Sequence, residues 1–158
     1  MERIVRIAHH AVVTGAGRLV TVGLGSCIAI AIHDPMARVA GLAHVLLPDV
    51  PANRQVENRA KFASTAVPML LEEMRAHGAT GPFVAKLAGG ARLFGDLLGS
   101  SGGTMGARNA AAARAALATA RVRIVAEDVG GDYGRTVTFD VASGELAVRT
   151  VRGRTHVL

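Results

Sequence analysis

Apolar residues alternate with small or polar residues in several short stretches of the chain. The clearest is residues 27–33, where an isoleucine at every second position alternates with Cys27, two alanines and His33. A period of two is typical of a β-strand, so this strand has one bulky face and one small face. Similar stretches predict strands at 3–13, 39–47, 82–90 and 121–128, and a hairpin over 134–151 with Ser143 and Gly144 at its tip.

Two segments have helical patterns instead. Residues 59–77 carry an apolar stripe at helical spacing, with Gly78 placed to end the helix and Pro68 predicting a kink or a break. Residues 110–120 are rich in alanine, and we expect Asn109 to cap this helix. The glycine-rich residues 91–108 predict a loop with room for one short helix.

These elements amount to about seven strands and two or three helices, several of the strands being joined by hairpins. We therefore expect an α/β protein of the α+β type, in which mixed or antiparallel β-sheets have helices packed on one side. The chain has 158 residues and contains no internal repeat or linker. This length predicts a single domain over residues 1–158.

Composition narrows the class of protein. Half of the residues are apolar, which excludes disorder, and one cysteine excludes an intrachain disulfide. The sequence shows neither a signal peptide nor an apolar run long enough for a membrane span, so we expect a cytoplasmic protein with no membrane insertion. The net charge is +6, which reflects either genomic base composition or an acidic partner. With no concentrated basic run and no Trp, we expect no nucleic acid among the partners.

The single cysteine and a histidine lie in neighbouring predicted strands. If the turn between these strands centres on Pro35 and Met36, Cys27 lies opposite His44, and a shift of two residues keeps them on one face. An imidazolium beside a thiol lowers the pKa of the thiol and makes it a nucleophile. The preceding "GLGS" lets backbone N–H groups face a substrate oxygen.

The residues alone leave other interpretations open. Cys27 fits a small core residue, and His44 fits a core histidine with satisfied hydrogen bonds. "GLGS" lacks the rest of a dinucleotide-binding motif, and Ser26 lacks the surroundings of a hydrolase serine. The histidines and the cysteine show no metal-ligand spacing, so we expect neither a metal nor a cofactor.

Five motifs in order, "GLGSCIAIAIHD", "GLAHVLLP", "AKLAGGARLF", "MGARN" and "EDVGGDYGRTVTFDVASGELAV", resemble the CheD family of chemoreceptor glutamine deamidases. The resemblance implies a three-layer α/β/β sandwich. It also implies hydrolysis of selected glutamine amides on chemoreceptors to glutamate, and of some glutamate methyl esters. Some members of the family bind and stimulate a CheC-type phosphatase.

The resemblance also implies roles for particular residues. Cys27 would be the nucleophile, His44 the general base and acid, and Thr21 the residue that orients the histidine. Backbone N–H groups of the Gly25–Ser26 segment would hold the oxyanion.

The implied substrates are chemoreceptor cytoplasmic domains, whose Glu-rich helices an Arg-rich surface would attract. We expect an accessible Cys27 at the rim of the sheet, under a shallow cleft with Arg92 and Arg108 nearby. The competing interpretation is a non-catalytic protein that binds and stimulates a CheC-type phosphatase, for which Cys27 and His44 would be dispensable.

Overall fold

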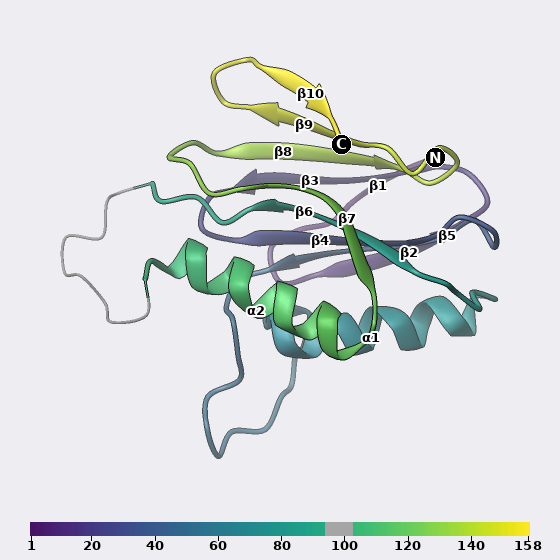
Figure 1. Ribbon diagram of the computed structural model, residues 1–158, viewed down its shortest axis with the longest axis horizontal. Coiled ribbons are helices and arrows are strands. Elements are labelled where there is room, and N and C mark those ends of the chain that lie inside the picture. The colour runs from purple at the N-terminus through teal and green to yellow at the C-terminus, as the bar shows by residue number, and fades with distance from the viewer. Residues whose placement is uncertain (94–102) are drawn as a thin grey trace.

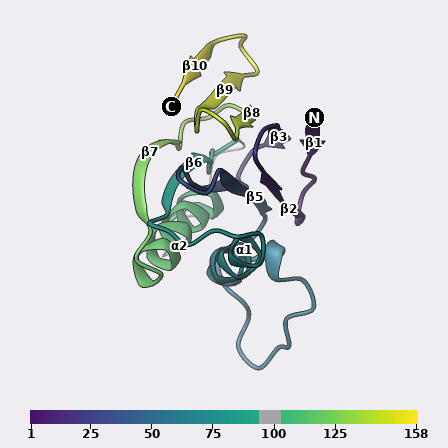
Figure 2. The same ribbon diagram turned by 90° about the vertical axis from the view of Figure 1, so that its right-hand side faces the viewer.

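The computed structural model describes residues 1–93 and 103–158, and it has three layers (Figures 1 and 2). Two α-helices pack on one five-stranded sheet, and a second five-stranded sheet covers the opposite face of the first. The predicted α+β sandwich is confirmed. The elements in chain order are β1 (Glu2–Ile4), β2 (His10–Thr14), β3 (Arg18–Leu24), β4 (Ile28–Asp34), β5 (Val39–Val45), η1 (Arg59–Lys61), α1 (Ala63–Ala76), β6 (Val84–Gly89), α2 (Met105–Thr119), β7 (Arg123–Val129), β8 (Arg135–Asp140), β9 (Leu146–Thr150) and β10 (Thr155–Val157).

The middle sheet has the strand order β2-β5-β4-β6-β7, and the outer sheet has the order β1-β3-β8-β9-β10. Each sheet contains one parallel pair, β6 with β7 and β1 with β3, and its other pairs are antiparallel. Both sheets are therefore mixed: α2 connects the parallel strands β6 and β7, and β2 of the other sheet lies between β1 and β3 along the chain.

The central strand β4 explains the layering. Its isoleucines pack with residues of α1 and α2, whereas Cys27, Ala29 and Ala31 belong to the core between the two sheets. Small side chains on that face let the outer sheet approach closely while the interior stays densely packed. The predicted bulky and small faces are confirmed.

The strand predictions need three corrections. The segment predicted as one strand over 3–13 is divided between two sheets, because the chain turns at Ala8, whose φ is +61°. Strand β3 was not predicted, since its glycine interrupts the apolar alternation. Strand β10 was also missed, because its three residues are all exposed and carry no periodic signal.

The helix predictions are right in number and wrong at two ends. Helix α1 begins at Ala63 after a separate 3₁₀ turn, and it continues through Pro68, which is exposed on its solvent side. Asn109 does not cap α2: the cap is Thr104, whose hydroxyl accepts from Ala107 N–H, and Asn109 lies inside the helix. Of the loop predicted over 91–108, residues 94–102 lie outside the described residues.

No helix in the described part of the chain is both long enough and apolar enough to cross a membrane.

Candidate active site

Cys27 and His44 lie on the same face of the middle sheet, toward the outer sheet. Strands β4 and β5 pair with Ala29 opposite His44, so the direct pairing of Cys27 with His44 predicted from the sequence is wrong by two residues. Cys27 is instead the diagonal neighbour of His44, at a separation of about 7–8 Å between backbone positions, which still lets the two side chains share one space. The same-face prediction therefore holds.

Thr21 reaches His44 from the outer sheet. Its Oγ1 lies 2.7 Å from His44 Nδ1 and 2.5 Å from the carbonyl oxygen of Val5. A hydroxyl has one proton, and the Val5 carbonyl can only accept, so Thr21 donates to Val5 and accepts from Nδ1–H of His44. This assigns the neutral ring its Nδ1–H tautomer and leaves the lone pair on Nε2.

Nε2 of His44 is buried and has no hydrogen-bond partner among the described residues. Within that same set, the Cys27 thiol donates no hydrogen bond to it. A buried polar atom without a partner costs free energy, and a catalytic role is one explanation for such an atom. The ring is therefore fixed at one nitrogen and free at the other, as a general base requires.

Burial shifts both titrating groups toward their neutral forms. It raises the pKa of the Cys27 thiol, and the residue's own N–H only partly opposes this. It lowers the pKa of His44 to about 4. The lowered thiol pKa expected from the sequence is therefore wrong for the resting protein, because no imidazolium stands beside the thiol at neutral pH.

The segment that carries the nucleophile is held by its carbonyl groups. The Cys27 carbonyl accepts from Gly90 N–H at 2.8 Å, and the Gly25 carbonyl accepts from Ala91 N–H at 2.9 Å. In residues 1–93 and 103–158, the N–H groups of Ser26 and Cys27 donate to no backbone carbonyl. Two N–H groups beside the thiol that no carbonyl in this part of the chain occupies are what the predicted oxyanion site requires.

Glycine is required where β6 passes the nucleophile. Gly89 has φ of +115°, and a Cβ added there would lie 2.3 Å from the Cys27 carbonyl oxygen. Any side chain would push the two strands apart. Cys27 itself precedes the first residue of β4, as expected for the rim of the sheet, but it is 6% exposed and thus more buried than predicted.

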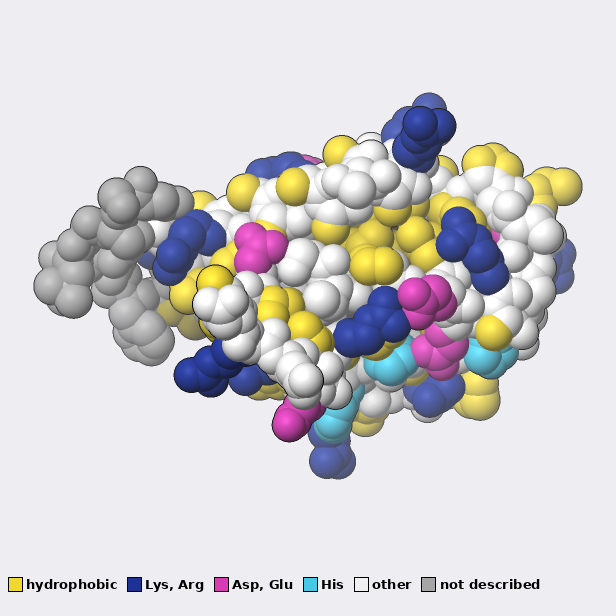
Figure 3. All heavy atoms as spheres, turned by 90° about the horizontal axis from the view of Figure 1, so that it is seen from below, with side chains coloured by type: hydrophobic (Ala, Val, Ile, Leu, Met, Phe, Trp, Pro, Cys, Tyr) yellow, Lys and Arg dark blue, Asp and Glu magenta, His cyan; other side chains and the backbone are white. Residues whose placement is uncertain are grey.

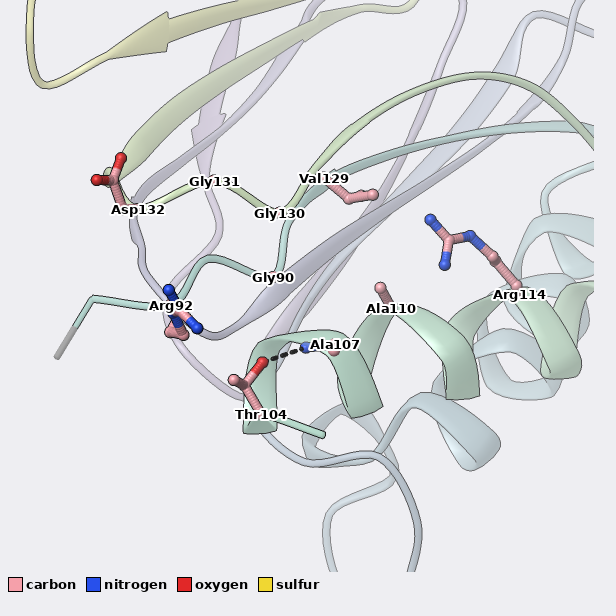
Figure 4. Close-up of a pocket in the computed structure, with 10 residues that line it drawn as sticks. All are labelled: Gly90, Arg92, Thr104, Ala107, Ala110, Arg114, Val129, Gly130, Gly131 and Asp132. Atoms are coloured by element: carbon pink, nitrogen blue, oxygen red, sulfur yellow. Dashed lines mark hydrogen bonds between the residues drawn. The ribbon is translucent and has the colours of Figure 1, made fainter. Parts of the chain in front are cut away.

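A cavity of about 560 Å³ lies beside this segment, with Gly90 in its lining. Figure 4 shows Arg92 and Arg114 at its two ends and the N-terminal turns of α2 along one side. Arg92 therefore lies near the nucleophile segment, as predicted. Arg108 is exposed on α2 and does not line this cavity.

Basic side chains are spread out on the face shown in Figure 3, with acidic side chains near several of them. The structure also contains ion pairs between exposed or half-buried side chains, such as Arg59–Glu72 and Arg114–Glu127. Among the described residues, the face in Figure 3 shows no continuous basic stripe of the kind that follows a nucleic-acid backbone.

Comparison with known proteins identifies the family to which this chain belongs. A family model described as CheD chemotactic sensory transduction matches residues 46–150. A protein of Geobacter metallireducens named "Probable chemoreceptor glutamine deamidase CheD 2" is 47% identical over 150 residues, covering 94% of this chain and 93% of that protein. The chain belongs to the CheD family.

Other CheD proteins agree along nearly the whole chain. The "Probable chemoreceptor glutamine deamidase CheD" of Moorella thermoacetica is 44% identical over 93% of this chain and 89% of its own length. The "Chemoreceptor glutamine deamidase CheD" of Thermotoga maritima is 40% identical over 97% of this chain and 94% of its own length. The resemblance inferred from five motifs is confirmed.

In this CheD protein the structure joins Thr21 to His44 and places Cys27, which directly follows Gly25 and Ser26, on the same face of the middle sheet as His44. Sequence reasoning missed the supporting groups, namely the Val5 carbonyl, the Gly90 N–H and Asn109. An asparagine within an alanine-rich helix was the one signal that could have found the last of these. Among the described residues, no three His, Cys, Asp or Glu side chains gather as a metal site.

Proposed function

We propose that this protein hydrolyses glutamine side-chain amides of chemoreceptor cytoplasmic domains to glutamate, with Cys27 as nucleophile and His44 as base and acid. The observation that carries the proposal is the arrangement of His44, whose Nδ1 is tied to Thr21 while its buried Nε2 is left without a partner on the face that holds the only thiol. The names of the CheD relatives point to the same reaction.

The reaction begins from a neutral pair. Cys27 gives its proton to Nε2 of His44, and the thiolate attacks the Cδ carbonyl of the glutamine. The N–H groups of Ser26 and Cys27 receive the oxyanion, and each such donor contributes on the order of 3 kcal/mol. His44 then returns the proton to the departing nitrogen, and ammonia leaves behind a thioester.

The second half repeats the proton transfers with water. His44 takes a proton from a water molecule, the hydroxide attacks the thioester, and glutamate leaves as the thiol is restored. A glutamate methyl ester fits the same steps, with methanol leaving instead of ammonia, so we include such esters among the substrates.

The charge of the chain fits an acidic substrate. The protein carries a net charge of +6, and Arg92 lies beside the nucleophile segment. Long-range attraction of this kind raises the association rate and is screened by salt. We therefore place the protein in the cytoplasm, where receptor signalling domains lie, and expect deamidation at low substrate concentration to slow as ionic strength rises.

The test is mass spectrometry of a receptor cytoplasmic fragment before and after incubation with the protein. The wild type should convert specific glutamines to glutamate, and Cys27→Ala should convert none. Unchanged glutamines with the wild type would refute the proposal. If a CheC-type phosphatase were then stimulated equally by the wild type and Cys27→Ala, the non-catalytic interpretation would replace it.

A further inference from the structure

Asn109 is an unusual residue for its position in α2. It is fully buried, with 0% exposure, in the second turn of a helix built mainly from alanine. Asparagine is a poorer helix former than alanine because its amide competes for backbone hydrogen bonds. Its presence there needs a reason beyond the helix itself.

The Asn109 side chain links the segments that carry the two reacting groups. Its Nδ2 donates to the Ser26 carbonyl at 2.9 Å and to the Leu46 carbonyl at 3.1 Å. Ser26 directly precedes the nucleophile, and Leu46 follows His44 by two residues. One amide group thus ties both chain segments to α2.

The orientation of this amide follows from its partners. Both partners are carbonyl oxygens, which can only accept, so the NH₂ group must face them. The Oδ1 atom then points elsewhere and is buried without a partner among the described residues. The protein therefore tolerates an unsatisfied acceptor at this position in order to keep two donors on the site.

The bond to Ser26 also fixes the direction of a catalytic donor. The Ser26 carbonyl and the Cys27 N–H belong to one planar trans peptide unit, so they point in opposite directions. Holding the carbonyl against α2 turns the Cys27 N–H away from α2. That N–H donates to no backbone carbonyl in the described part of the chain.

We propose that Asn109 is a positioning residue that aims the Cys27 N–H at the oxyanion and keeps the nucleophile segment in register with the end of β5. This role bears on catalysis only through the proposed function, on which it rests. Asn109 itself does not contact the substrate.

Two reactions of the single thiol distinguish orientation of the Cys27 N–H from simple packing of Asn109 in the core. A peptide in which the glutamine side-chain amide is replaced by an aldehyde forms a thiohemiacetal whose oxygen needs the oxyanion donors. Iodoacetamide alkylates the same thiol without forming an oxyanion. Because Cys27 is the only cysteine, both reactions report on one group.

The variants are Asn109→Ala, which suits a helix, and Asn109→Asp, which keeps the shape but removes both donors. We expect aldehyde affinity and kcat for deamidation to fall about 10- to 100-fold, with KM and the iodoacetamide rate within about twofold of the wild type. The matched control is Leu117→Ala, a fully buried residue two turns along α2 in the core away from the site. It should lower stability and leave both probes unchanged.

Wild-type aldehyde affinity in both Asn109 variants would overturn the inference. An equal fall in aldehyde affinity and in the iodoacetamide rate, seen in the Asn109 variants and also in Leu117→Ala, would overturn it too. The role of Asn109 would then be packing alone. If the wild type leaves receptor glutamines unchanged but binds the aldehyde in an Asn109-dependent way, the proposed function fails and the positioning role stands.

Discussion

Replacing Thr21 with valine tests the link between the two sheets at the candidate site. Valine has nearly the shape of threonine and favours a strand, so Thr21→Val removes the hydroxyl and little else. Thr21 is fully buried, and its hydroxyl serves both His44 Nδ1 and the Val5 carbonyl. The substitution leaves those two buried groups without their partner.

The expected cost follows from these two groups. Each buried donor or acceptor left unsatisfied costs about 1–3 kcal/mol, so the free energy of unfolding should fall by roughly 2–6 kcal/mol. A domain of this size has a total stability of about 5–15 kcal/mol, so a loss below about 5 kcal/mol leaves the variant folded at moderate temperature. The imidazole also loses the contact that holds its tautomer, and we expect kcat to fall about tenfold or more.

Urea denaturation measures the stability, and nitrogen NMR of the ring measures the tautomer. The matched control is Thr138→Val on the neighbouring strand β8, where Thr138 lies opposite Val20, is only half-buried and has no side-chain hydrogen bond within the described residues. The control should change stability by less than about 0.5 kcal/mol.

Wild-type stability and an unchanged ring tautomer in Thr21→Val would show that the hydroxyl does not hold His44. An equal loss in Thr21→Val and Thr138→Val would show that the cost comes from the sheet and not from the site. Either result would refute the tautomer assignment on which the mechanism depends.

Three further predictions concern the thiol, pH and a buried carboxylate. Cys27→Ala should abolish deamidation, as measured by mass spectrometry. Its free energy of unfolding in urea should fall by only about 1 kcal/mol, because the side chain loses little volume. Burial lowers the pKa of His44 from 6.5 to about 4. As pH falls, His44 is therefore protonated in the unfolded chain at a higher pH than in the folded protein. Stability should therefore fall as pH drops from 6.5 to 4, by roughly 3 kcal/mol in total, and His44→Gln should remove this share of the pH dependence of the urea midpoint. Asp34 is fully buried, and although burial raises its pKa, the backbone N–H groups that bind its carboxylate lower the pKa by more. Asp34→Asn should therefore lower the free energy of unfolding, measured in urea, by about 2 kcal/mol. Asp140→Asn, at the half-buried end of β8, should lower it by less. Equal losses in the last two variants would contradict that account.

The sequence predicts the parts of the site that depend on alternation. Side-chain alternation in 27–33 correctly places the thiol on the small face of β4. Alternation does not predict how β4 pairs with β5, because the turn between them spans four residues and ends at Arg38 with φ of +54°. The sequence does not show that Arg38 adopts this left-handed backbone conformation. It therefore fits a turn centred one residue earlier equally well.

The supporting contacts could not be predicted in the same way. Thr21 and Asn109 reach the site from a different sheet and from a helix, and such contacts depend on how the layers dock. Burial of the thiol and the imidazole is likewise a property of the whole molecule, and it reverses the pKa shift that the pair suggests in isolation.

The hydrogen bond between Thr21 and His44 joins β3 of one sheet to β5 of the other. The middle sheet alone holds the thiol and the imidazole, yet the ring has no defined tautomer until the outer sheet packs against it. We therefore expect competence for the proposed reaction to appear only when the two sheets dock, and not when either sheet forms alone. On refolding, recovery of activity should coincide with closure of the core between the sheets and lag behind the return of strand structure.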